Sequence, residues 1–121
     1  MAFAEPPRRG CIIPRAGRYH PRMWYSIFGH DAQGALPARK QHRPAHLARL
    51  EALRDAGRLL LAGPCPAIDA ADPGPAGYTG SLIVAEFDSL DAAQAWARLD
   101  PYLAGGAWAR VDVRPFLRVL P

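Results

Sequence analysis

The alternation of apolar and polar residues predicts four strands separated by helices and loops. Apolar runs place these strands at residues 23–29, 58–63, 81–87 and 107–119. Gly29 is expected to end the first strand. In the last strand, the period of two residues puts Trp108 and Val111 on opposite faces. The segment between the second and third strands is rich in proline, glycine and aspartate, which predicts a long loop over residues 64–80.

Two helices are predicted from the period of 3.6 residues. The first is expected to begin near Pro44, whose ring suits the first helical position, and to end at Gly57. His46 lies on the apolar stripe of this helix, whereas Arg49 is expected to face away from it. The second helix is predicted over residues 89–99. It ends there because the residue before a proline is pushed out of the helical region.

The element order β-α-β-β-α-β is that of the ferredoxin-like α+β folds. Right-handed crossovers place both helices on one face of the four-stranded sheet. Residues 23–28 and 81–87 carry large apolar side chains on both sides of the strand, so the second face also needs a cover. With no third helix predicted, we expect a homodimer that packs sheet to sheet.

Length and composition describe one ordinary globular domain. The 121 residues are 50% hydrophobic and 21% charged, which argues against a wholly disordered chain. No apolar run approaches the roughly 20 residues needed to cross a bilayer, so no membrane partner is expected. The net charge of +4 lies in residues 1–22, and the balanced remainder offers no basic face for phosphates. Nucleic acid is therefore not an expected partner.

Residues 1–22 differ from the rest of the chain in composition. They hold five arginines and four prolines without a sustained period. We therefore predict a flexible basic leader, followed by a folded domain over residues 23–121. Cys11 and Cys65 lack the CxxC spacing of redox and zinc motifs. This favours a reducing compartment, and the cytoplasm is the expected location.

The strand and helix directions bring distant residues to one rim of the sheet. His46 and Asp100 both fall at this rim, and a carboxylate beside an imidazole fixes its tautomer and raises its basicity. The two residues are therefore candidates for a catalytic pair. Each also has a plainer interpretation, His46 as a core residue and Asp100 as a helix-end residue. The expected substrate-binding residues at the same rim are Arg43, Gly63, Pro64, Ser81 and Tyr102.

Three sequence blocks carry a family resemblance. They are RPAHLARLEALRDAGRLLLAGPCPAIDAADPG, GYTGSLIVAEFDSLDAAQAWARLDPY and VRPF. Over nearly all of residues 23–121 the chain resembles the YciI-like, or YCII-related, family. The resemblance implies a dimeric α+β barrel without a metal or an organic cofactor, and it implies that His46 and Asp100 are the catalytic pair. One studied branch of this family acts as a dehydrochlorinase on a chlorinated hydroxyquinol.

The residues at the same rim also suggest two other kinds of site. His42 and His46 are four residues apart and His30 falls at the same end, a spacing that permits metal ligands. The absence of an HExxH pattern argues against a metal. Cys65 as a nucleophile would need His46 beside it, and a cysteine between two prolines is more simply a tolerated turn residue.

The leading hypothesis is a cofactor-independent enzyme in which His46 moves a proton and Asp100 orients the imidazole. Proton abstraction, as in an elimination or an isomerisation, fits such a minimal site. The substrate is expected to be a small aromatic or cyclic molecule. The alternative is a non-catalytic dimer that binds a small ligand in the same cleft, as a binding or regulatory protein.

Overall fold

A computed structural model describes residues 22–121, so the expectation for the leader lies outside the described residues except at Arg22. The elements in chain order are β1 (Met23–Asp31), α1 (Leu36–Asp55), β2 (Leu59–Pro66), η1 (Gly74–Ala76), β3 (Tyr78–Phe87), α2 (Leu90–Arg98), α3 (Pro101–Ala104) and β4 (Trp108–Phe116). The strands form one antiparallel sheet in the order β2-β3-β1-β4. The predicted α+β class and ferredoxin-like order are confirmed.

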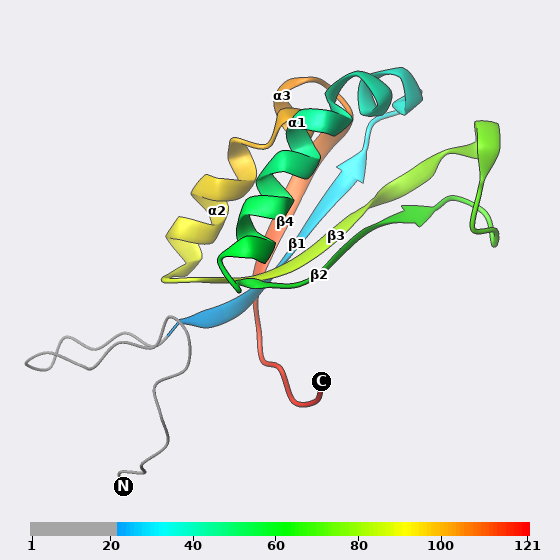
Figure 1. Ribbon diagram of the computed structural model, residues 1–121. Helices are drawn as coiled ribbons and strands as arrows, with labels where there is room; N and C mark the ends of the chain where they lie inside the picture. The colour runs from blue at the N-terminus through cyan, green and yellow to red at the C-terminus, as the bar shows by residue number, and fades with distance from the viewer. Residues whose placement is uncertain (1–21) are drawn as a thin grey trace, which may run out of the picture.

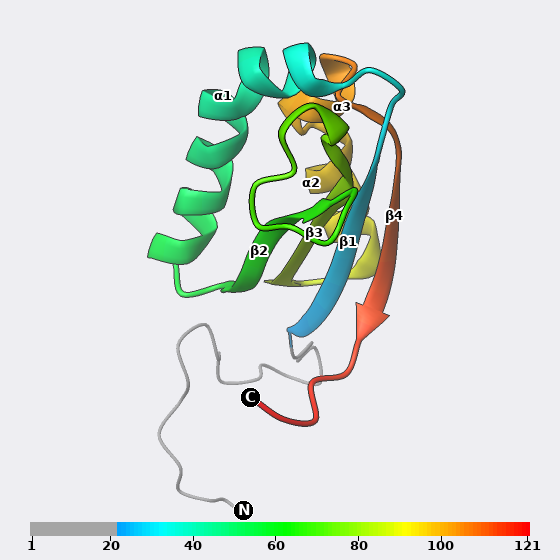
Figure 2. The ribbon, with the colours of Figure 1, turned by 90° about the vertical axis from the view of Figure 1, so that its right-hand side faces the viewer.

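The helices cover one face of the sheet (Figures 1 and 2). Alternate strand residues point into the helix layer because successive side chains of a strand lie on opposite faces. Between the layers, Ile27, Ile83 and Phe87 of the sheet pack with Leu53 and Ala97 of the helices, and each is at most 4% exposed. No helix within the described residues is both long and apolar enough to cross a membrane.

The first helix is longer than predicted. α1 begins at Leu36 with Pro37 in its first turn, and Pro44 lies inside the helix. A proline in the first turn loses no hydrogen bond, whereas an interior proline removes one and bends the helix. Figure 2 shows the first turns of α1 running across one end of the molecule before the rest descends beside the sheet. The predicted start at Pro44 was therefore wrong, and Pro37 is the first-turn proline.

The first and last strands also differ from the prediction. β1 does not end at Gly29 but continues to Asp31. A β-carbon at Gly29 would overlap the ring of Trp108, so glycine is needed there because the indole packs on the strand. The register of β1 with β4 shifts between His30 and Asp31. This bulge turns Trp108 to the helix-covered face, the same face as Val111, and buries it to 2% exposure.

β2 and β3 extend into the segment that was predicted to be a loop. β2 continues to Pro66 and β3 begins at Tyr78. Pro64 pairs with Ser81 in the ladder, and an edge strand tolerates this proline because its outer backbone groups need no partner. The pairing places Pro64 and Ser81 side by side near the rim of the sheet.

The short helix α3 was not predicted. Asp100 is its N-cap, and the side chain accepts a hydrogen bond of 2.9 Å from the backbone N–H of Tyr102. Pro101 occupies the first turn. An aspartate cap followed by a proline is a known helix start, so the sequence held a local signal for this helix. α3 turns Tyr102 inward, where it is 2% exposed.

The opposite face of the sheet carries no helix (Figure 1). Trp24 and Phe28 point to this face because they alternate along β1 with the buried Ile27. Leu82 does the same in β3, where it alternates with Ile83. The expectation of a second apolar face thus agrees with the strand registers, and its cover by a second copy of the chain stays a prediction.

Candidate functional site

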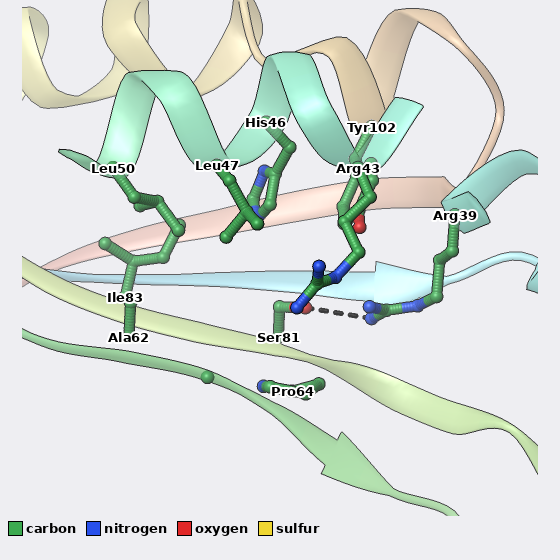
Figure 3. Close-up of a pocket in the computed structure, with 11 residues that line it drawn as sticks. Arg39, Arg43, His46, Leu47, Leu50, Ala62, Pro64, Ser81, Ile83 and Tyr102 are labelled. Atoms are coloured by element: carbon green, nitrogen blue, oxygen red, sulfur yellow. Dashed lines mark hydrogen bonds between the residues drawn. The ribbon is translucent and has the colours of Figure 1, made fainter. Parts of the chain in front are cut away.

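A pocket of about 200 Å³ lies between α1 and the part of the sheet formed by β2 and β3 (Figure 3). Its lining residues are Arg39, Arg43, His46, Leu47, Leu50, Ala62, Gly63, Pro64, Ser81, Ile83 and Tyr102. The structure thus brings His46 together with all five residues that were predicted to bind substrate. Asp100 does not line the pocket. The function of these residues in binding stays a prediction.

Helical spacing explains what α1 contributes to the pocket. Arg39, Arg43, His46 and Leu50 follow one another at intervals of four, three and four residues, which places them on one face of the helix. Because α1 begins well before Pro44, this face extends beyond His46 and adds two guanidinium groups. Sequence reasoning missed Arg39, and a helix start at the earlier proline would have revealed it.

His46 and Asp100 form a buried pair. His46 Nδ1 lies 2.9 Å from Asp100 Oδ1 and 3.0 Å from Oδ2. Since a carboxylate only accepts hydrogen bonds, Nδ1 carries the hydrogen and donates it. His46 is 5% exposed and borders the pocket, whereas Asp100 has no exposed surface. In the neutral imidazole this arrangement leaves the lone pair on Nε2.

Asp100 has two further partners. The Nη1 atom of Arg49 lies 3.4 Å from Asp100 Oδ2, close enough for an ion pair, and the Tyr102 N–H donates to Oδ1. The Arg49 guanidinium also lies over the Trp96 ring, with 4.1 Å between Cζ and the ring centroid. Burial lowers the pKa of Arg49, and the charge of Asp100 partly opposes this effect. The prediction that Arg49 faces away was wrong, because it helps to balance the buried carboxylate.

Two aromatic rings hold the imidazole of His46. The Tyr102 ring stacks on it with 4.0 Å between centroids and 10° between planes, and Trp108 meets it edge-on at 5.5 Å. Burial raises the pKa of Tyr102, and the charges of Arg39 and Arg43 only partly counter this. The Tyr102 hydroxyl therefore stays protonated at neutral pH and can donate a hydrogen bond.

Arg39 and Asp31 form a second buried pair beside the pocket. Arg39 donates two hydrogen bonds of 2.7 Å to the Asp31 carboxylate and one of 2.8 Å to Ser81 Oγ. Burial by itself lowers the pKa of Arg39, but the hydrogen bonds and charge of Asp31 hold it above its ordinary value. This bidentate contact ties the first turns of α1 to the end of β1 and positions the Ser81 hydroxyl.

The candidate metal-binding histidines lie in different places. His30 Nε2 donates to Asp112 Oδ2 at 2.7 Å, on the helix-free face of the sheet. The ring of His42 packs against Gly105. Within residues 22–121, no group of three or more His, Cys, Asp or Glu side chains is arranged to hold a metal ion.

Cys65 does not border the pocket. It follows Pro64 in β2, and because Pro64 lines the pocket, the next side chain points to the opposite face of the sheet. The thiol is therefore not beside His46, and the structure gives no support to the hypothesis of a cysteine nucleophile.

The sequence of this domain is similar to a known family profile and to several known proteins. The profile of the YCII-related domain matches residues 23–117. Protein YciI from Escherichia coli and Protein YciI from Shigella flexneri are each 57% identical to the chain over 97 residues, covering 80% of this chain and 99% of the relative. An uncharacterized protein from Haemophilus influenzae is 48% identical over the same share of both chains. The similarity therefore spans the whole pocket.

One solved structure is similar in both fold and sequence. It is the 5-chloro-2-hydroxyhydroquinone dehydrochlorinase from Burkholderia phenoliruptrix AC1100, in complex with 2,5-dihydroxybenzoquinone. The match has a TM-score of 0.68 at 29% identity, and it covers 78% of this chain and 94% of that chain.

Proposed function

The chain belongs to the YCII-related domain family, and from the geometry of its pocket we propose that it is a small-molecule enzyme of the lyase type. In this proposal His46 removes a proton from a small cyclic substrate, Asp100 orients the imidazole, and no cofactor takes part. The observation that carries the proposal is the buried hydrogen bond of 2.9 Å between His46 Nδ1 and Asp100 Oδ1, at the wall of a pocket.

His46 suits the part of a general base because its two nitrogens have different tasks. Nδ1–H donates to Asp100, which leaves the Nε2 lone pair for a substrate in the pocket. When Nε2 takes a proton, the ring becomes an imidazolium, and the adjacent carboxylate stabilises its charge. Stacking against Tyr102 keeps the imidazole ring in the same plane before and after it takes the proton.

An elimination balances with these groups alone. His46 Nε2 takes the proton from one carbon, and the electron pair of the broken C–H bond forms the new double bond. The bond from the neighbouring carbon to the leaving group breaks, and that group departs with its electron pair. The imidazolium then releases its proton to water. An isomerisation would share the first step, and support for elimination comes from the dehydrochlorinase at 29% identity.

The first test uses the two compounds named for that dehydrochlorinase as probes. We expect the protein to speed the exchange of the ring hydrogens of 2,5-dihydroxybenzoquinone in D₂O, followed by NMR, or to release chloride from 5-chloro-2-hydroxyhydroquinone. His46→Gln should lower either rate by roughly 10²- to 10⁴-fold, the usual contribution of a general base. Binding of either probe without exchange or chloride release would favour the binding or regulatory protein instead.

The second part of this test asks whether the pair acts as a unit. Asp100→Asn should lower the rate of proton exchange or chloride release, because an amide does not stabilise the imidazolium. Asp112→Asn is the matched control, since Asp112 pairs with His30 on the other face of the sheet. It should leave the rate of proton exchange or chloride release unchanged. A rate that is the same in wild type and in Asp100→Asn would remove the pair from the mechanism.

A further inference from the structure

Two guanidinium groups line the pocket, and they are engaged differently. Arg39 is already occupied by Asp31 and by the Ser81 hydroxyl. Arg43 is exposed, and among residues 22–121 no hydrogen bond or ion pair engages it. Figure 3 shows its side chain reaching from α1 into the pocket, toward Ser81. Arg43 is therefore a cation on the pocket wall that is available to a ligand.

The two acidic side chains that pair with pocket-lining residues are already balanced. Asp31 pairs with Arg39, and Asp100 has Arg49 beside it as well as the imidazole. The Asp31 and Asp100 side chains are 6% and 0% exposed, so neither reaches the surface where Arg43 lies. Within the described residues, the charge of Arg43 is thus uncompensated.

Part of the pocket wall is apolar, and the space is small. Leu47, Leu50 and Ile83 form this wall. The volume of about 200 Å³ is below the roughly 300–1,000 Å³ of sites for drug-sized ligands, so it suits a single ring. Arg43 and His46 are three residues apart on one helix face, where β-carbons lie about 5–6 Å apart. A group bound by Arg43 therefore sits next to the atoms that face the imidazole.

We propose that the pocket binds a single-ring ligand carrying one anionic oxygen group, a carboxylate or a phenolate, which pairs with Arg43. The apolar wall contacts the ring, and the Ser81 and Tyr102 hydroxyls supply neutral hydrogen bonds. This inference rests on the proposed function for the part played by His46, and it adds the charge of the substrate. Arg43 then also stabilises the negative charge that develops when the C–H bond breaks.

Benzoate and benzamide test the charge preference, because they share a ring and differ in charge. NMR titration of the full chain should show benzoate binding roughly tenfold more tightly than benzamide, as expected for a charge-assisted hydrogen bond. Arg43→Gln should abolish this preference. Lys40→Gln is the matched control, since it removes an exposed positive charge one turn earlier on α1 and should keep the preference.

Three results would overturn the anion site: no binding of benzoate, equal affinities for the two probes, or an equal effect of both variants. None of these measurements requires turnover. A preference lost only in Arg43→Gln, without proton exchange or chloride release, supports the anion site and contradicts the proposed enzyme. Turnover that Arg43→Gln leaves unchanged, with no preference for benzoate, supports the enzyme and contradicts the anion site.

Discussion

The His46 imidazole is held on three sides, and each contact restricts a different freedom. Asp100 determines which nitrogen carries the hydrogen, Tyr102 sets the plane of the ring, and Trp108 closes one edge. A base held in this way loses little further freedom when a substrate binds, which favours proton transfer. At the scale of single residues, the candidate site depends on contacts between segments that are far apart in the sequence.

The buried Tyr102 hydroxyl leads to a prediction about alkaline pH. Burial raises the pKa of Tyr102 above its ordinary value of about 10. A raised pKa in the folded state means that this contribution to stability is present below pH 10 and is lost as the pH rises through the folded-state pKa. Tyr102 should therefore ionise only above pH 10. The measurement is the near-ultraviolet absorbance of phenolate, taken as the difference between wild type and Tyr102→Phe during a pH titration. A Tyr102 that ionises below pH 10 would contradict its buried state.

At the scale of elements, the bend in α1 decides how the two arginines meet the histidine. Arg39 and Arg43 come before Pro44 and His46 comes after it, so the bend sets the angle between the two parts of the pocket wall. An interior proline costs a helix roughly 3 kcal/mol through its missing N–H and its steric clash. Pro44 thus destabilises α1 at the position where the bend shapes the pocket.

Replacing Pro44 should raise the stability of the protein and weaken ligand binding. We expect Pro44→Ala to restore a helical hydrogen bond and to raise the free energy of unfolding by about 1–3 kcal/mol, measured by urea denaturation. The straighter helix should move Arg43 away from the pocket and weaken benzoate binding. Pro37→Ala is the control, because a first-turn proline removes no hydrogen bond and its replacement should give no such gain. A variant that is less stable than wild type would show that the bend is required for folding.

At the scale of the whole molecule, the helix-free face of the sheet is the largest unexplained feature. Trp24, Phe28 and Leu82 point to it, and at its edges Leu61 and Phe116 are 46% and 38% exposed. Large apolar side chains that gather on one uncovered face often mark an interface. We propose that a second copy of the chain covers it, with the two sheets packed face to face.

Light scattering tests this proposal directly. The wild type should have about twice the chain mass of 13.2 kDa, and Leu82→Lys should reduce it to a monomer because each copy would bury an unpaired charge in the interface. Leu99→Lys is the matched control, since Leu99 is 74% exposed at the end of α2, on the helix side of the sheet. A wild-type protein that stays monomeric at micromolar concentration would mean that this face has a different partner.

The sequence by itself determined the order of the elements, the ferredoxin-like topology and the rim at which His46 and Asp100 meet. These depend on short-range rules, namely the hydrophobic period within each element and the handedness of the crossovers. The meeting of the two residues at one rim was therefore predictable without any knowledge of packing.

Only the tertiary structure decided which residues support that pair. Arg49 was predicted to face away, but it approaches a carboxylate that lies 51 residues further along the chain. Arg39 was missed because the first helix was predicted to begin only near Pro44, and Trp108 lies on the other face because a bulge alters the strand register. A local period carries no information about a charge partner or a bulge, because both depend on which segments of the folded chain lie side by side.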